Sequence, residues 1–203
     1  MSPRRHVSVY QHVYLALIHY PVYDKHRAIV ATSITNFDIH DISRTAKTYE
    51  VGHYYLVTPL KSQQELGKRI IRHWHEGLGS RYNPSRQIAM LKTSIIDSLE
   101  TAKREILEKW LTPPILIATH AKVPEGFEEK VITFRQLRAD LQKNLNQPYL
   151  ILFGTGYGLT ESTYKEVNFI LEPIRGIADY NHLSVRSAVA IILDRLLGHR
   201  EES

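Results

Sequence analysis

The sequence predicts an α/β fold built on a parallel β-sheet that is covered by helices on both faces. Apolar strands alternate with amphipathic helices along the chain, and the strands are continuously apolar instead of alternating between apolar and polar residues. Strands of that kind are buried on both faces, which is typical of parallel sheets with crossover helices. The chain has 203 residues, a length that one core can fill, so we expect a single domain over residues 1–203.

The first half of the chain gives strands and helices in turn. The strands are apolar and rich in β-branched or aromatic residues, and they cover 13–22, 28–34 and 54–59. The helices carry apolar residues at steps of three and four, and they cover 38–51, the segment from Ser62 to Gly77, and 88–110. Ser62 and Glu65 match an S-x-x-E capping box, which predicts how the second helix begins.

The second half continues the alternation. Strands are predicted at 113–121, 148–154 and 167–174, and helices at 134–145 and 184–198. Gly198 is expected to end the last helix as a C′ residue. That helix is apolar on nearly all sides, so we expect one side to pack on the sheet and another on a second subunit, as in a homodimer.

Composition narrows the range of partners. The chain has 26 Lys and Arg against 21 Asp and Glu, with a pI near 9.3, which favours a polyanion such as RNA. No apolar stretch approaches the roughly 20 residues of a membrane span, so we expect no membrane partner and a cytoplasmic location. The chain has no cysteine, and the His73-Trp74-His75 trio would point its histidines in different directions on a helix, so we expect no metal.

A glycine-rich turn follows the most apolar strand, in the stretch ILFGTGYGLT at residues 151–160. Ligands of parallel sheets bind at the carboxyl ends of the strands. Glycine permits positive φ angles and lets the backbone approach a ligand closely. A tight turn between strand and helix would explain the same pattern, and a dinucleotide-binding fingerprint fits poorly because it belongs after the first strand.

Three segments together resemble the ordered motifs of the SPOUT superfamily of S-adenosylmethionine-dependent RNA methyltransferases. The segment NFDIHDISRTAKTYEV (36–51) resembles the family's asparagine, arginine and small pair, here Asn36, Arg44, Thr45 and Ala46. The stretch ILFGTGYGLT resembles its FG-x-x-G-x-GL turn. The segment 172–198 resembles its proline, apolar residue, x and glycine, followed by L-x-V-x-x-A at a helix start. The match runs in order over nearly the whole chain, as in a stand-alone catalytic domain of this superfamily.

The resemblance implies a fold, a cofactor and a dimer. The carboxyl-terminal part would form a deep trefoil knot, and its crossing loops would hold S-adenosylmethionine largely through main-chain groups. Apolar side chains beside these loops would enclose the adenine, and ordinary core packing at strand ends is the alternative for each of them. The residues implied to bind the cofactor are Thr119, Leu152, Phe153, Gly154, Thr155, Gly156, Ile174, Gly176, Ile177, Asn181, Leu183, Ser184 and Val185.

Four residues are candidates for catalysis. The arginine that matches Arg44 is assigned in the ribose-methylating branch to activating the 2′-hydroxyl, but a guanidinium is a poor base, so we favour phosphate or ribose positioning. Asn36 would orient Arg44 or a substrate oxygen, or would cap a helix. Asp179 and His182 would accept or shuttle a base proton, or would only hydrogen-bond within their loop. The second motif is shorter than in that branch and lacks its acidic residue, so the target atom stays open.

Basic residues gather on the predicted helix that ends before Gly77 and in the loop RYNPSR at 81–86. Arginine beside an aromatic residue suits phosphate contact and base stacking, so we expect RNA to bind Arg72, Arg81, Tyr82 and Arg86. A solvated helix face is the alternative for the helix. The predicted function is transfer of a methyl group from S-adenosylmethionine to a structured tRNA or rRNA. The alternatives are an inactive knot-fold RNA-binding protein and a nicotinamide-nucleotide-binding enzyme.

Overall fold

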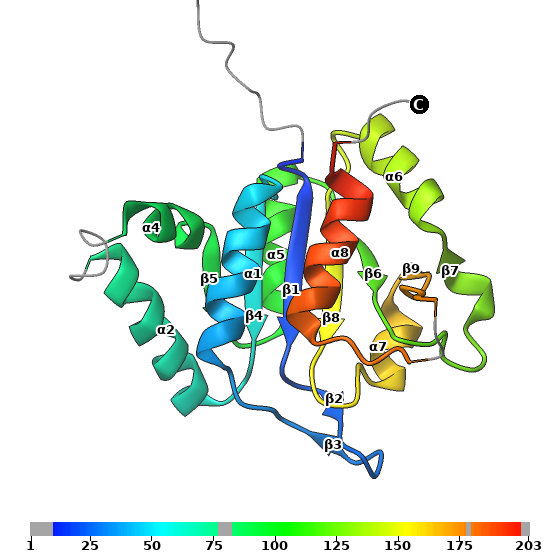
Figure 1. The fold of residues 1–203 in the computed structure, drawn as a ribbon, viewed down its shortest axis with the longest axis horizontal. Coiled ribbons are helices and arrows are strands. Elements are labelled where there is room, and N and C mark those ends of the chain that lie inside the picture. Colours follow the sequence, from blue (N-terminus) through cyan, green and yellow to red (C-terminus); the bar gives the residue numbers. More distant parts are fainter. Residues whose placement is uncertain (1–9, 77–82, 178–179, 200–203) are drawn as a thin grey trace, which may run out of the picture.

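The computed structural model describes residues 10–76, 83–177 and 180–199. Its centre is a seven-stranded sheet in the order β5-β4-β1-β8-β6-β9-β7, in which every neighbouring pair is parallel (Figure 1). The strands are β1 (Val13–Ile18), β4 (His53–Val57), β5 (Thr93–Ile96), β6 (Ile115–Ala118), β7 (Val131–Ile132), β8 (Tyr149–Gly154) and β9 (Phe169–Leu171). A separate antiparallel hairpin joins β2 (Val22–Tyr23) to β3 (Ile29–Val30). The predicted parallel α/β fold is confirmed.

Helices cover both faces of the sheet. The helices on one face are α1 (Asn36–Thr48), α2 (Lys61–His75), α4 (Pro84–Met90), α6 (Phe134–Lys143) and α8 (Val185–Leu197). The opposite face carries α5 (Leu99–Trp110) and α7 (Glu161–Glu166), and a short 3-10 turn spans Glu128–Lys130. In β1, Leu15 and Leu17 belong to the first apolar core, whereas Ala16 and Ile18 belong to the second. This two-sided burial explains why the strand is continuously apolar.

The order of strands creates a natural ligand site. From β1 the chain moves outward through β4 to β5, and it then crosses to β6 on the other side of β1. Strand β8 later fills the position between β1 and β6. Ligands of open parallel sheets bind where the strand order reverses, at the carboxyl ends. The glycine-rich turn at the end of β8 lies at this point.

The predicted long helix at 88–110 is wrong. The structure divides this segment into α4, strand β5 and α5. In strand β5, Thr93, Ile95 and Ile96 are β-branched. Ser98 then caps α5 by accepting a hydrogen bond from the backbone N–H of Thr101. Ile88 and Leu91, which began the apparent helical stripe, are 47% and 61% exposed. The helical spacing across the three elements was therefore a coincidence.

Smaller predictions about helix ends are also corrected. Helix α2 begins at Lys61 with Leu60 as its N-cap and no side-chain cap, so Ser62 and Glu65 do not form a capping box. Thr35, not Asn36, caps α1 by accepting from the backbone N–H of Asp38. Gly198 is the C-cap of α8 with φ of −63°, so it does not adopt the left-handed conformation of a C′ glycine.

The remaining elements differ mainly in length. The strand predicted over 28–34 is reduced to the two residues of β3. These follow a turn in which the Asp24 carboxylate accepts backbone hydrogen bonds from His26 and Ala28. Short elements such as α7 and β7 were not predicted. Among the residues that the structure describes, no helix has the length and apolar character that crossing a bilayer requires.

Candidate active site

A cavity of about 890 Å³ lies at the carboxyl ends of β1, β6 and β8. We call it the carboxyl-end cavity. Its walls come from segments that are far apart in the sequence: His19, 32–38, 119–122, 153–158, 171–174 and 181–192. Because no two neighbouring segments of the chain could build it alone, the cavity exists only once the sheet has formed.

The carboxyl-end cavity has an apolar wall and a polar wall. The apolar wall is formed by the ends of β8 and β9, by α8 and by the segment before α8, with Phe153, Leu171, Ile174, Leu183 and Ile192. The polar wall comes from the connection between β1 and α1, with His19, Thr32, Ser33, Thr35 and Asp38. This pairing fits a ligand that has an aromatic ring system at one place and charged or hydrogen-bonding groups at another.

Gly156 and Gly158 allow the glycine-rich turn to pack closely against the β2–β3 hairpin. Gly156 and Gly158 have φ angles of +59° and +104°. A Cβ on Gly156 would come within 2.8 Å of the carbonyl oxygen of Tyr23 in the β2–β3 hairpin. The backbone N–H of Tyr157 donates to that same oxygen at 2.8 Å, and Gly158 accepts from the N–H of Tyr23 at 3.0 Å. The expected positive φ angles are present, and the close backbone approach is to the hairpin.

A row of hydrogen bonds ties the polar wall to the turn. Thr155 donates from Oγ1 to the carbonyl oxygen of Ile18 at 3.0 Å, and its Oγ1 lies 2.6 Å from Oγ1 of Thr32. The Oγ1 of Thr32 lies 2.9 Å from Nδ1 of His19. His19 is 1% exposed, and its Nε2 atom is buried with no hydrogen-bond partner among the described residues. Within this row, Nε2 of His19 is therefore the atom that still lacks a hydrogen-bond partner, which a ligand could supply.

Burial also fixes the charge of His19. Desolvation lowers the pKa of His19 from 6.5 to about 4, and the nearby charge of Asp38 opposes that shift only in part. The imidazole is therefore neutral at neutral pH. Asp38 is 7% exposed, and its Oδ2 accepts from the hydroxyl of Thr35 at 2.6 Å.

The structure brings most of the predicted cofactor residues to the carboxyl-end cavity. They are Thr119, Phe153, Gly154, Thr155, Gly156, Ile174, Asn181, Leu183, Ser184 and Val185, and the catalytic candidate His182 joins them. Leu152 is fully buried in the core and offers its carbonyl oxygen to Thr119, so its side chain does not line the cavity. Gly176 has open space around it and Ile177 is fully exposed, and neither lines the cavity. Asp179 lies outside the described residues.

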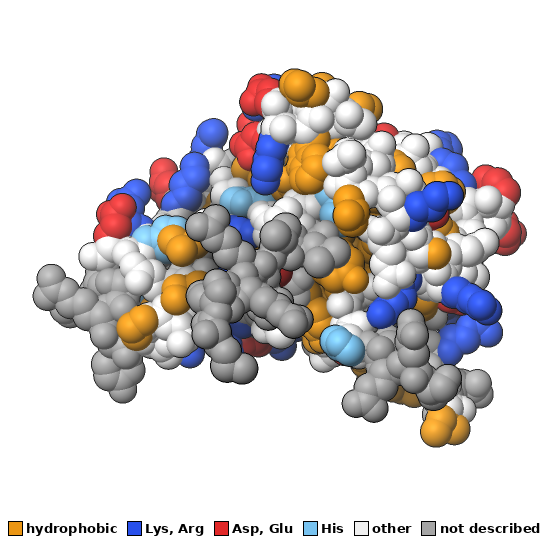
Figure 2. Space-filling model, turned by 90° about the horizontal axis from the view of Figure 1, so that it is seen from above, with side chains coloured by type: hydrophobic (Ala, Val, Ile, Leu, Met, Phe, Trp, Pro, Cys, Tyr) orange, Lys and Arg blue, Asp and Glu red, His pale blue; other side chains and the backbone are white. Residues whose placement is uncertain are grey.

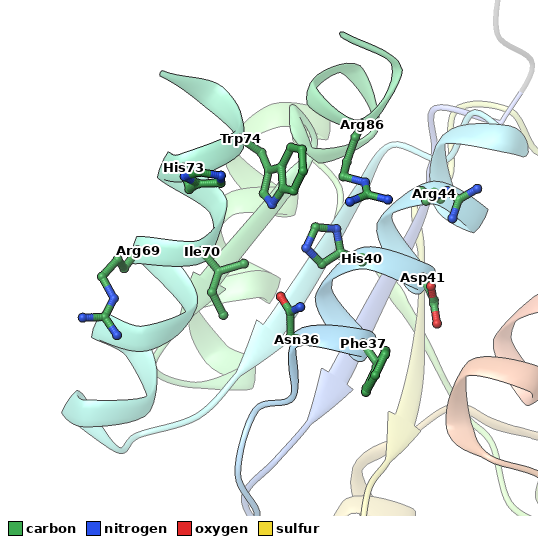
Figure 3. Close-up of a pocket in the computed structure, with 10 residues that line it drawn as sticks. All are labelled: Asn36, Phe37, His40, Asp41, Arg44, Arg69, Ile70, His73, Trp74 and Arg86. Carbon is green, nitrogen blue, oxygen red and sulfur yellow. The ribbon is translucent and has the colours of Figure 1, made fainter. Parts of the chain in front are cut away.

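A second depression, of about 600 Å³, lies between α1, α2 and α4 (Figure 3). We call it the α1–α2–α4 groove. Asn36, His40 and Arg44 follow one another at helical steps of four along α1, so they share one side of that helix. Arg86 of α4 lies with its guanidinium carbon 4.6 Å from the ring centre of Trp74, and His40 meets the same ring edge-on at 5.3 Å. The groove therefore combines cations with an aromatic face.

The charge of the α1–α2–α4 groove is predominantly positive. Arg44, Arg69 and Arg86 line it, against the single carboxylate of Asp41. Burial lowers the pKa of His40, and the neighbouring charges of Arg86 and Arg44 lower it further. An anion such as a phosphate would relieve this concentration of positive charge.

The two predicted RNA-binding residues that the structure describes, Arg72 and Arg86, lie in different places. Arg72 is exposed on α2 and does not line the groove, whereas Arg86 does. Arg81 and Tyr82 lie outside the described residues. Figure 2 looks onto the amino ends of the strands, and on this face Lys and Arg side chains are scattered among Asp and Glu without forming one basic area in the described part. The concentrated positive charge of the groove is thus a local feature.

Sequence reasoning missed several residues of these two sites, and four of them carry the arguments made below. His19 and Asp38 of the cavity and His40 and Trp74 of the groove were not proposed as site residues. His40 could have been found from its spacing between Asn36 and Arg44 on one helix. His19 could have been noted as a polar residue at the carboxyl end of the first apolar strand, where ligands bind.

The fold and the carboxyl-end cavity together define a class of α/β protein that binds a cofactor at the carboxyl ends of parallel strands. Residues 12–198 match a family model described as SAM-dependent RNA methyltransferase, so the chain belongs to that family. The predicted membership of the SPOUT superfamily and the predicted cofactor, S-adenosylmethionine, are confirmed, and the nicotinamide alternative is not favoured.

Two relatives are similar to most of this chain, and a solved structure shares its fold. A tRNA (guanine-N(1)-)-methyltransferase of Nitratidesulfovibrio vulgaris is 42% identical over 93% of this chain, and the chain spans 42% of that relative's length. An uncharacterized protein of Aquifex aeolicus is 37% identical over 94% of the chain and 90% of its own. A SpoU methyltransferase from Streptomyces viridochromogenes, solved with S-adenosylmethionine, shares the fold at a TM-score of 0.55 and 14% identity, covering 91% of this chain and 56% of its own.

Proposed function

We propose that this chain holds S-adenosylmethionine in the carboxyl-end cavity and transfers the methyl group to a nucleotide of tRNA. The observation that carries the proposal is the cavity itself. Its apolar wall comes from the segments that resemble the second and third family motifs, and its polar wall comes from the connection between β1 and α1. The choice of tRNA is supported by the names of two relatives, of which this chain spans 42% each. The proposal treats residues 1–203 as one domain, and the cytoplasmic location stays a prediction.

We propose the trefoil knot as the path that brings these segments together. After β9 the chain returns over the ends of β6 and β8 to α8, which packs beside α1 (Figure 1). The side-chain amide of Asn181 donates to the carbonyl oxygen of Ala121 at 2.7 Å, so the segment before α8 lies against the connection after β6. Loops that lie against each other in this way are what a knotted crossing requires.

The cofactor's adenine would lie against the apolar wall of the cavity. Phe153, Ile174 and Leu183 would enclose the ring and exclude water, and Thr119, Gly154, Thr155, Gly156, Asn181, Ser184 and Val185 would supply polar and main-chain groups. Leu152 would act by packing beneath this wall. Gly176 and Ile177 would contribute only if their segment closed over the ligand.

When bound, S-adenosylmethionine supplies a methyl group on a positively charged sulfur. The protein's task is then to align the nucleophile and, where the nucleophile carries a proton, to accept that proton. His182 lines the cavity and would accept it, and Asp179 is the other candidate. Arg44 and Asn36 line the α1–α2–α4 groove on the other side of α1, so we assign them to positioning the RNA.

We propose a homodimer because the groove and the cavity are separate within one chain. Both adjoin α1, which contributes Thr35 and Asp38 to the cavity and Asn36 and Arg44 to the groove. A second copy that packed near α1 would bring its groove beside this cavity. RNA held by one subunit would then reach the methyl group held by the other.

Mass spectrometry of tRNA nucleosides from cells with and without the gene tests the function. We expect one methylated nucleoside to disappear without the gene, to return with the wild-type chain, and to stay at least about tenfold reduced with Arg44→Ala. The matched control is Arg104→Ala, since Arg104 is an exposed arginine of α5 on the opposite face of the sheet. A full complement of the nucleoside with Arg44→Ala would contradict the role of Arg44, and unchanged nucleosides without the gene would contradict the proposed substrate.

A further inference from the structure

The hydrogen-bond row on the polar wall determines which ring nitrogen of His19 carries its proton. A hydroxyl group has one proton to donate. Thr155 uses its proton on the carbonyl oxygen of Ile18, so in the 2.6 Å contact between the two threonines the donor must be Thr32. With its own proton used in that contact, Thr32 can only accept from His19.

The neutral imidazole of His19 therefore carries its proton on Nδ1, which lies 2.9 Å from Oγ1 of Thr32. This leaves Nε2 with a bare lone pair. Nε2 is a buried acceptor without a donor among the described residues, and His19 lines the carboxyl-end cavity. Leaving a buried acceptor unsatisfied is unfavourable, so a ligand that brings an N–H group to this place gains that interaction.

Asp38 adds a negative charge to the same wall. Its carboxylate accepts one hydrogen bond, from Thr35, and within the described part of the chain no lysine, arginine or histidine forms an ion pair with it. It is close enough to His19 to act on that ring electrostatically. The buried carboxylate of Asp38 and the unprotonated Nε2 of His19 would together favour a ligand group that is positively charged and has several N–H donors.

We infer that Nε2 of His19 and the carboxylate of Asp38 bind the α-ammonium group of S-adenosylmethionine. This inference rests on the proposed placement of the cofactor in the carboxyl-end cavity. The adenine amino group also donates hydrogen bonds, but it is neutral and belongs to a ring that suits the apolar wall. The ammonium group carries both the charge that Asp38 needs and the donor that His19 needs, so it accounts for both features at once.

Calorimetric binding of two ligands tests this inference without relying on turnover. S-adenosylhomocysteine carries the amino-acid end, and methylthioadenosine has the same adenosine part without it. We expect His19→Phe, which keeps a ring but removes the acceptor, to weaken S-adenosylhomocysteine about tenfold or more and to leave methylthioadenosine within about twofold. Asp38→Asn is expected to show the same selective loss.

The matched control is His53→Phe. His53 is another histidine whose burial lowers its pKa to about 4, but it is bonded to Ser94 near the amino end of the sheet and does not line the cavity. The His53→Phe variant should bind S-adenosylhomocysteine and methylthioadenosine as tightly as wild type does.

Equal weakening of the binding of both ligands by His19→Phe, or no weakening of either, would overturn the inference. The binding of methylthioadenosine itself reports that the variant is folded. If His19→Phe binds neither ligand, Asp38→Asn decides by the same criteria. Failure of the wild-type chain to bind either ligand would instead contradict the proposed site.

Discussion

The carboxyl-end cavity and the α1–α2–α4 groove are built in different ways. The cavity is formed by connections after parallel strands, and its shape depends on the path of the backbone from His19 to Ile192. The groove is formed by side chains at helical spacing on three helices. Changes in the cavity should therefore act through the backbone and the fold, whereas changes in the groove should remove one contact at a time.

The largest effect is expected at the glycine-rich turn. Gly156→Ala would force a side chain into a positive φ angle and against the carbonyl oxygen of Tyr23, 2.8 Å away. Gly126 is the matched control because it also has a positive φ, of +81°, but has nothing within 4 Å. We expect the free energy of unfolding to fall by about 3 kcal/mol for Gly156→Ala and about 1 kcal/mol for Gly126→Ala. Equal losses in chemical denaturation would show that the hairpin contact does not matter.

The loss of stability in acid gives a second test of the cavity, since it depends on the pKa of the buried His19. Burial lowers the pKa of both His19 and His53 from 6.5 to about 4. Between these values the unfolded chain binds protons that the folded chain does not, so stability is full above pH 6.5 and falls as the pH drops toward 4. Each histidine should remove about 2 kcal/mol of unfolding free energy between pH 7 and pH 5.

Denaturation of wild type, His19→Phe and His53→Phe at both pH values checks this acid response. Each variant should lose about 2 kcal/mol less than wild type on acidification. An identical loss for wild type and His19→Phe would mean that burial does not lower the pKa of His19 in the folded protein.

The groove should show a smaller effect, confined to RNA binding. Arg86→Ala removes a guanidinium that stacks on Trp74, so tRNA affinity should fall about tenfold while the affinity for S-adenosylhomocysteine stays constant. Arg72→Ala, on the exposed side of α2, is the control and should change tRNA affinity by about threefold or less. Filter binding at several salt concentrations measures both variants. A larger effect of Arg72→Ala would place the RNA outside the groove.

The smallest effect concerns the serines at the starts of α2 and α5. Ser98 caps α5, whereas Ser62 makes no side-chain cap on α2. Ser98→Ala should therefore cost about 1 kcal/mol of unfolding free energy and Ser62→Ala should cost close to none. The reverse order in thermal or chemical denaturation would contradict these cap assignments.

The sequence predicted the carboxyl-end cavity and the α1–α2–α4 groove to different degrees. The apolar strands and the glycine-rich turn located the carboxyl ends correctly, because strand burial and positive φ are local properties. His19 and Asp38 were missed because their meaning depends on segments that only the folded sheet brings together. Helical spacing placed Asn36 with Arg44, yet the same reasoning joined α4, β5 and α5 into one helix, since a short strand of β-branched residues can continue a helical pattern by chance. The strand order and the division between cavity and groove are tertiary properties, which periodicity does not encode.

A crystal structure of the chain with S-adenosylhomocysteine tests the central claim most directly. The account predicts the adenine against Phe153, Ile174 and Leu183, and the ammonium group within hydrogen-bond distance of Nε2 of His19. A ligand bound in the α1–α2–α4 groove, or an adenine placed outside the carboxyl-end cavity, would contradict it.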